Sequence, residues 1–286
     1  SAEVDATPAS DKIPGRLSFW TTDTLMYPRE RLRIQSSGKV SIGSTETSTG
    51  LLLLDKNITA ESDVSDKNNY HLVIRSQTNS NTSKIGIAFA NTTNDEHVGA
   101  AILHHRESTD SQGTLSFYTS PTSGTTTERM KIDRYGNVTK PNHCCFEVKL
   151  NGDQSFNSAS RFKLNFNYVA NQQGTTFDTG NNRFTAPVTG YYQFNIGVYS
   201  YYSTYMEIDG RCNGASTGAK TYRPTTRYSD GTDRNPGASM MASWVVKLDA
   251  NDYYEIYCYV VSSSGTRNIY SDINRTPTWW SGFLVA

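Results

Sequence analysis

A sharp corner between two strand-like segments, at residues 182–194, is the feature that most limits how this chain can fold. Pro187 fixes the backbone angle φ and Gly190 permits a turn, so the chain changes direction between them. Beyond the corner, apolar side chains recur at every second position, at Tyr192, Phe194, Ile196 and Val198. This is the period of a strand with one buried face, so the run predicts a β-sandwich strand that enters its core.

The same run resembles the signature of the globular head of complement component one-q, a jelly-roll family related to tumour necrosis factor. The matching segments read Phe-Thr-Ala-Pro-Val-Thr-Gly-Tyr-Tyr-Gln-Phe at 184–194 and Trp-Ser-Gly-Phe-Leu-Val at 280–285. The resemblance covers about residues 142–286. It implies a compact trimer that recognises another molecule, and it does not imply an enzyme.

Two further runs in this half alternate in the same way. Residues 162–168 read as one amphipathic strand, and residues 253–260 carry aromatic rings on both faces. Because a monomeric sandwich would show water mostly polar residues on its outer face, the second aromatic face favours burial at a trimer interface.

Composition excludes several classes of partner. The 27 basic and 27 acidic residues cancel, so the chain offers no long-range attraction to nucleic acid or to an anionic membrane. No apolar run approaches the roughly 18 residues of a membrane span, so we expect a soluble chain without membrane insertion. The four cysteines are too few and too irregular for a disulfide framework or a zinc site, and Cys258 is expected to be a buried thiol.

The N-terminal half contains a repeat with a period of 98 residues. Gly-Arg-Leu-Ser-Phe-Trp-Thr at 15–21 returns as Gly-Thr-Leu-Ser-Phe-Tyr-Thr at 113–119, and Glu-Arg-Leu-Arg-Ile at 30–34 returns as Glu-Arg-Met-Lys-Ile at 128–132. A constant spacing without insertions indicates one structural unit that has been copied.

The repeat defines three predicted domains: a truncated copy at 1–43, a complete copy at 44–141 and the head at 142–286. Ser1 would then lie inside a longer protein. Each copy reads as short strands, with further ones expected at 71–75, 85–89 and 100–103. Because these strands are short and sparsely apolar, we expect each copy to bury its core against other chains.

The segment at 30–43 resembles a recurrent element of bacteriophage tail fibres. It reads Glu-Arg-Leu-Arg-Ile-Gln-Ser-Ser-Gly-Lys-Val-Ser-Ile-Gly, whereas the second copy lacks the final Ile-Gly at 139–141. This departure falls where the shaft would end. The resemblance implies a trimeric shaft that carries a globular tip.

No enzyme motif stands out. The chain has no zinc-protease motif, no phosphate-binding glycine loop and no nucleophile elbow, so we predict no catalytic residues and no cofactor. His104 and His105 would point to opposite faces of a strand, so at most one could face a trimer axis and we predict no metal site. The acidic pairs Asp230/Asp233 and Asp249/Asp252 lie in turns that favour Asp for backbone reasons, although a glycosidase pair remains an alternative.

Recognition is better supported by the sequence. Of the 18 tyrosines, most follow residue 168, and tyrosine supplies rigid amphipathic contact area. The loop at 222–234 mixes rings, guanidinium groups and carboxylates without apolar alternation, which suits stacking on sugars and binding of their polar groups. A solvated loop with internal ion pairs is the alternative. The candidate receptor-binding residues are Tyr222, Arg223, Arg227, Tyr228, Asp230, Asp233 and Arg234.

A second tyrosine cluster, at 199–205, is expected to serve either packing or binding, whereas Trp279 and Trp280 are expected to pack.

The sequence therefore predicts an all-β, elongated homotrimer in which β shaft repeats precede a C-terminal jelly-roll β-sandwich. We expect the distal part of a phage tail fibre or virion appendage, located on the virion, that attaches to a bacterial surface glycan or protein receptor beside other virion proteins. The alternatives are a structural connector whose head drives trimerisation and, third, a tip that degrades glycan.

Overall fold

The chain is all-β in every part that the computed structural model describes, which confirms the predicted all-β class. The described residues are 2–4, 15–22, 27–42, 52–54, 70–76, 80–91, 97–109, 111–122, 124–200, 203–222, 225–226, 238–262, 267–271 and 278–286. They form two compact units, residues 1–86 and 87–286. None of them belongs to a helix that is long and apolar enough to cross a membrane. The domain limits at 43/44 and 141/142 stay a prediction from the repeat.

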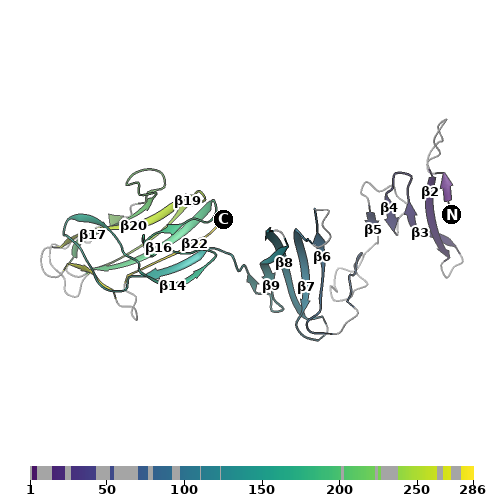
Figure 1. Cartoon of the computed structure of the whole chain (residues 1–286), viewed down its shortest axis with the longest axis horizontal. Coiled ribbons are helices and arrows are strands. Elements are labelled where there is room, and N and C mark those ends of the chain that lie inside the picture. The colour runs from purple at the N-terminus through teal and green to yellow at the C-terminus, as the bar shows by residue number, and fades with distance from the viewer. Residues whose placement is uncertain are drawn as a thin grey trace. The chain divides into compact units, whose positions relative to one another are not determined.

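Two five-stranded sheets precede the head (Figure 1). The first has the order β1 (Ala2–Val4), β2 (Gly15–Thr22), β3 (Pro28–Ile34), β4 (Val40–Ile42), β5 (Leu52–Leu54), and only the β4–β5 pair is parallel. The second has the order β10 (Val138–Thr139), β9 (Thr125–Ile132), β8 (Gly113–Thr122), β7 (Ala100–Arg106), β6 (Lys84–Phe89).

The 98-residue repeat folds in the same way twice. Leu17 lies opposite Ile34 in the first sheet, and Leu115 lies opposite Ile132 in the second. In both copies the register shifts two residues after the leucine. The repeated sequence thus specifies the pairing register as well as the strands.

Side-chain hydrogen bonds also recur in the two copies of the repeat. The Arg31 Nε donates to Thr21 Oγ1 at 2.9 Å, and the Arg129 Nε donates to Thr119 Oγ1 at 2.8 Å. The turn that follows contains a glycine with positive φ in each copy, Gly38 at 80° and Gly136 at 87°. A side chain would be strained there, which explains why glycine stands at both positions.

One face of each repeat sheet is apolar, and its side chains stay partly exposed among the described residues. In the first sheet the side chains on this face are 37% to 52% exposed, and they are Leu17, Phe19, Ile34 and Ile42. In the second, Leu115 is 38% and Val138 56% exposed. The opposite face of the first sheet buries the polar Ser18 and Ser41 instead.

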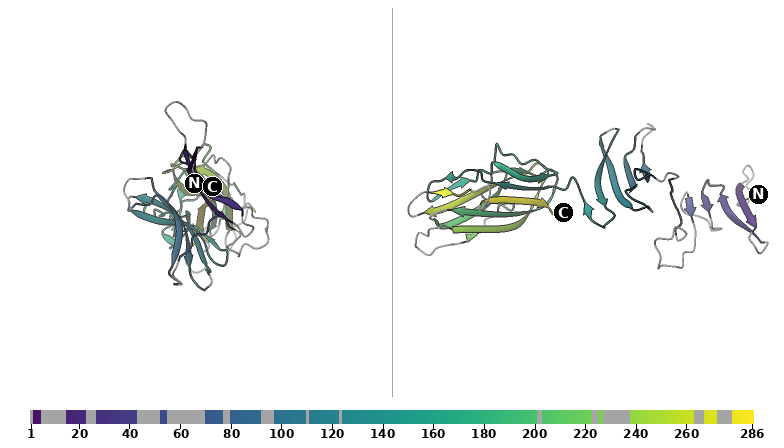
Figure 2. Two further views of the ribbon diagram at one scale, coloured as in Figure 1. Left: turned by 90° about the vertical axis from the view of Figure 1, so that its right-hand side faces the viewer. Right: turned by 90° about the horizontal axis from the view of Figure 1, so that it is seen from below.

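The head is a two-layer sandwich (Figures 1 and 2). Sheet I has seven strands: β12 (Gln154–Ser155), β21 (Asn268–Ile269), β16 (Gly190–Ser200), β22 (Trp279–Leu284), β11 (Cys145–Lys149) and β14 (Tyr168–Gln173) in this order, with β19 (Ala238–Leu248) also paired to β16. Sheet II has five: β13 (Ser160–Lys163), β20 (Tyr253–Ser262), β17 (Ser203–Cys212) and β18 (Thr225–Thr226), with β15 (Phe184–Thr185) also paired to β20.

Aromatic side chains fill the space between sheets I and II. The Trp280 ring is fully buried and meets Phe146 edge-on with ring centroids 5.0 Å apart. The predicted alternation beyond the corner is confirmed, because Tyr192, Phe194, Ile196 and Val198 are at most 1% exposed. The corner is tied back to this core, since Tyr192 donates its hydroxyl to the Val188 carbonyl at 2.7 Å.

Two predicted strands are wrong in detail. Residues 162–168 do not form one strand: β13 ends at Lys163 in sheet II, and the chain crosses to sheet I before β14 begins. The crossing is held by amides, because Asn167 Oδ1 accepts from the Asn151 backbone N–H at 2.7 Å and its Nδ2 donates to the Asn151 carbonyl at 2.8 Å. Residues 71–75 are exposed and form no strand, since no described strand pairs with them.

Candidate functional site

The outward face of sheet II is covered by arginines stacked on tyrosines. The Arg211 guanidinium lies 4.0 Å from the Tyr257 ring centroid, and Arg161 lies 5.3 Å from that of Tyr259. Such cation–π contacts shield the rings from water. The second aromatic face of residues 253–260, which the sequence assigned to a trimer interface, is therefore covered in large part by side chains of the same chain.

Ion pairs complete this layer. The Arg161 Nη1 donates to Asp209 Oδ2 at 2.6 Å, and its Nη2 bonds to Glu207. The Lys163 Nζ donates to Glu255 Oε1 at 3.0 Å. Asp209 is fully buried and Glu255 nearly so, so both carboxylates depend on these cations. The charged side chains of this layer thus form ion pairs with one another within the described residues.

Tyr222 is the candidate receptor-binding residue that the structure describes. Its ring lies nearly parallel to that of Trp244, with centroids 5.1 Å apart and planes 14° apart, and the residue remains 42% exposed. Its backbone N–H donates to the Gly210 carbonyl at 2.9 Å and its carbonyl accepts from the Gly210 N–H at 2.7 Å. The other candidates lie outside the described residues: Arg223, Arg227, Tyr228, Asp230, Asp233 and Arg234.

Glycine at position 210 permits this stack. A Cβ atom there would lie 2.6 Å from the Tyr254 ring and 2.7 Å from Trp244 Cζ2. Trp244 in turn donates its Nε1 hydrogen to the Tyr254 hydroxyl at 3.2 Å. Burial raises the pKa of Tyr254 well above its usual value, so this hydroxyl stays neutral and can accept the bond.

The acidic pair Asp249/Asp252 is held by a lysine that the sequence analysis missed. The Lys220 Nζ donates to Asp249 Oδ2 at 2.7 Å and also to Asp252 Oδ2. The Lys220 hydrogen bond lowers the pKa of Asp252 from 3.8 to about 2. A glycosidase acid needs a raised pKa, so this arrangement supports a structural role for the pair. The pair Asp230/Asp233 lies outside the described residues.

A small pocket of about 300 Å³ opens beside Tyr222, and we call it the Tyr222 pocket. It is lined by Ala219, Lys220, Thr221, Tyr222, Val245, Val246 and Lys247. Of these, only Tyr222 was a candidate from the sequence. The exposed positions Val245 and Lys247 alternate with the buried Val246 and Leu248, which is the signal that could have placed them on the surface.

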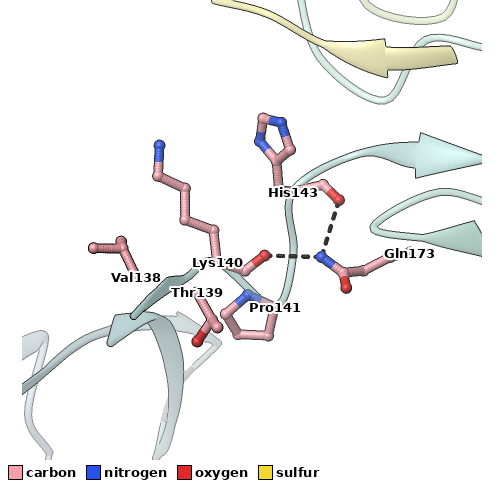
Figure 3. A pocket seen from close by; sticks show the side chains of 6 residues that line it. All are labelled: Val138, Thr139, Lys140, Pro141, His143 and Gln173. Atoms are coloured by element: carbon pink, nitrogen blue, oxygen red, sulfur yellow. Dashed lines mark hydrogen bonds between the residues drawn. The ribbon is translucent and has the colours of Figure 1, made fainter. Parts of the chain in front are cut away.

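A second pocket of about 380 Å³ lies where the chain enters the head (Figure 3). The Gln173 amide donates to the carbonyls of Lys140 and His143, at 2.9 and 3.3 Å. Gly174 is required beside it, because a Cβ atom would lie 2.4 Å from the Asn142 carbonyl oxygen. These contacts fix the path of the linker rather than build a ligand site.

The histidines and cysteines show no metal centre within the described residues, where no three His, Cys, Asp or Glu side chains gather. His104 and His105 lie opposite Leu115 and Thr114 and so face opposite ways, as predicted. All four cysteines are unpaired, and Cys258 is a fully buried thiol, as predicted.

The remaining aromatic candidates pack against other side chains of the head. Tyr199 meets Tyr270 edge-on at 5.8 Å, and Tyr205 meets Tyr259 at 5.9 Å. Trp280 is in the core, and Trp279 lies so close to Gly197 that a Cβ atom there would come within 2.5 Å of its ring. The tyrosines at 201 and 202 lie outside the described residues.

The outward face of sheet I differs from that of sheet II, because its large apolar side chains have little cover. Met241 on β19 is 74% exposed, Val245 52%, and Phe283 on β22 41%. Val245 and Phe283 flank Gln193 of β16 in register, so they share this face with Tyr191 and Met241. Gln193, Asn195 and Ser243 form a hydrogen-bonded polar group between these apolar side chains on the same face.

The two-layer topology, the corner and the aromatic core define the head as a jelly-roll β-sandwich. Residues 145–285 match the C1q domain family. Among solved structures, the globular domain of a zebrafish complement 1qA protein is similar at 16% identity, with a TM-score of 0.35 over 50% of this chain and 98% of that chain. Murine APRIL is similar at 11% identity, with a TM-score of 0.37 over 50% and 99%.

Two relatives from Bacillus subtilis (strain 168) are similar in sequence. The phage-like element PBSX protein XkdV is 29% identical over 134 residues, 44% of this chain and 19% of the relative. The uncharacterized protein YqcC is 28% identical over 113 residues, 39% of this chain and 31% of the relative. The chain thus spans less than a third of the length of either relative.

Proposed function

We propose that this chain is the distal part of a phage tail fibre or similar virion appendage, and that its head attaches to a receptor, chiefly glycan, on the bacterial surface. The observation that carries the proposal is the joining of a repeated β-sheet unit to a C1q-like head in a chain that is similar to a phage-like element protein. In this role the protein binds and breaks no bond.

The proposed assembly is a homotrimer. C1q- and tumour-necrosis-factor-like domains commonly form trimers. The exposed apolar side chains of sheet I support the same assembly here, since three copies would remove Met241 and Phe283 from water. The apolar faces of the two repeat sheets would be covered in the same assembly, beside other virion proteins. Several trimers per particle would multiply weak single-site binding.

A structural connector is the second candidate. It is favoured by the outward face of sheet II, whose charges are already satisfied within the chain, and by apolar surface that suits trimerisation. A glycan-degrading tip is third, and it predicts loss of receptor polymer on incubation.

Binding of the purified, fluorescently labelled chain to whole cells of candidate hosts tests the proposal. The comparison is a variant with Tyr222, Arg223, Arg227 and Tyr228 changed to Ala. Selective binding that this variant loses, at unchanged trimer mass, supports a receptor-binding head. Unchanged binding would move the site elsewhere on the head, and absence of binding to every cell type would favour the connector.

A further inference from the structure

The Tyr222 pocket offers an aromatic surface that is already fixed in place. The Tyr222 ring rests on the buried Trp244, which is itself held by Tyr254, and the Tyr222 backbone is paired with Gly210 in both directions. A ligand that stacks on this ring would therefore pay little entropy to order it. The exposed Val245 extends the apolar wall.

Polar groups around the wall retain unused hydrogen-bonding capacity. An ammonium has three donors, and Lys220 uses two of them on Asp249 and Asp252. Lys247 makes no hydrogen bond or ion pair to the rest of the described chain. The Thr221 hydroxyl donates to the Ala215 carbonyl at 3.1 Å, so its oxygen remains free to accept.

Among the described residues, the lysines that line the pocket and the carboxylates that bind Lys220 balance in charge. Lys220 and Lys247 supply two positive charges, whereas Asp249 and Asp252 supply two negative ones. Asp249 is also largely exposed and can accept from a ligand hydroxyl. These four charges therefore give no net attraction for an anion within the described residues, and their mixture of donors and acceptors matches hydroxyl groups.

We propose that the Tyr222 pocket binds one neutral pyranose residue of a bacterial surface glycan. The apolar face of the sugar ring stacks on Tyr222 and Val245, and its hydroxyls bond to Lys220, Thr221 and Lys247. A volume of about 300 Å³ lies at the lower end of ligand pockets and suits a single sugar residue. This inference rests on the proposed adhesive function and names the ligand class.

The pocket opens at the margin of the face that we assign to the trimer contact. Val245 and Lys247 lie on β19, which pairs only with β16 among the described strands. The site should therefore be tested on the intact trimeric chain.

Saturation-transfer difference NMR with the full chain is the test, using methyl glucoside, methyl galactoside, N-acetylglucosamine and N-acetylgalactosamine as probes and glucuronic acid as the anionic comparison. At least one neutral probe should bind, with little dependence on salt. Lys247→Met keeps the length of the side chain and removes the donor, so it should weaken binding about tenfold, the usual cost of one hydrogen bond to a charged group. Tyr222→Ala should abolish detectable binding.

Two matched variants serve as controls. Tyr222→Phe preserves the stack on Trp244 and should bind as the parent does, and Tyr135→Ala removes a 74% exposed tyrosine outside the head and should also leave binding unchanged. The proposal is overturned if no neutral probe binds, if glucuronic acid binds better, or if Lys247→Met and Tyr222→Ala bind normally. Any of these results together with selective cell binding would reject the pocket and leave the adhesive function standing.

Discussion

Arg161 donates a hydrogen bond to the buried carboxylate of Asp209, 2.6 Å away, by reaching across strand β20 from β13 to β17. The contact joins three strands of sheet II through one side chain. Asp209 has a second cation, because Arg211 Nη2 lies 3.2 Å away. The outward face of sheet II is thus held by charges that the chain supplies to itself.

Replacing Arg161 with Met should lower the free energy of unfolding by about 2 kcal/mol. This is less than the ~3–5 kcal/mol of a fully buried pair, because Arg161 is partly exposed and Arg211 remains beside Asp209. Urea unfolding of the parent and the variant measures the difference. Arg134→Met, an exposed arginine in the turn after β9, is the control and should change stability by less than ~0.5 kcal/mol. Equal losses in both variants would contradict this role for Arg161.

Stability should fall in acid partly through Asp252. Its folded pKa of about 2 lies below the ordinary 3.8, so its contribution is present above about pH 4 and is lost as the pH falls through about 2. Because Lys220 is partly exposed, solvent screening limits the pair to about 1 kcal/mol. Asp252→Asn should therefore lose about this much at pH 7 and show a flatter profile from pH 4 to 2. A profile parallel to that of the parent would exclude Asp252 as a source of the acid sensitivity.

Gly210→Ala should be strongly destabilising, by about 2–3 kcal/mol, because the added methyl group would collide with the Tyr254 and Trp244 rings. It should also disturb the Tyr222 pocket and quench or shift tryptophan fluorescence. Gly180→Ala is the matched control, since its Cβ atom would lie 3.5 Å from the Asp178 carboxylate, an ordinary contact. Thermal unfolding followed by circular dichroism distinguishes the two variants, and similar melting temperatures would show that the rings can move aside.

Thiol reactivity should separate Cys145 from the other cysteines. Burial raises the pKa of Cys144 and of Cys212 to about 11 and raises that of Cys258 further, so very little thiolate forms on them near neutral pH. Cys145 is partly exposed and should react first with a chromogenic disulfide at pH 8. All four should react in guanidinium. Fast labelling of a second thiol in the native protein would show that the core opens locally.

The alternation of apolar residues and the 98-residue repeat predicted those parts of the fold that are set by residues close together in the sequence or by the repeated unit. The buried face of β16 follows from alternation alone, and the repeat carried the pairing of Leu17 with Ile34 over to Leu115 with Ile132. The crossing after Lys163 was missed, because alternation continues through a segment that changes sheets.

The candidate site was harder to predict because its contacts are distant in sequence. Lys220 binds carboxylates about thirty positions away, and Trp244 of sheet I supports Tyr222, which bridges to Gly210 of sheet II. Turn chemistry explained the aspartates at 249 and 252 without revealing their lysine partner. The arginines that cover the tyrosines of β20 likewise come from other strands. The aromatic sequence of β20 alone therefore could not reveal that its outer face is covered.

The last prediction concerns the proposed trimer. If the outward face of sheet I is the contact between copies, a charge placed there would have to be buried without a partner, which costs several kcal/mol per site. Met241→Glu and Phe283→Glu should therefore each convert the trimer to monomer in sedimentation equilibrium at micromolar concentration, with the head still folded because both side chains point away from the core. Tyr135→Glu, at a position as exposed as Met241 but outside the head, should remain trimeric. Trimers from both head variants would place the contact elsewhere, and a monomeric parent would reject the trimer itself.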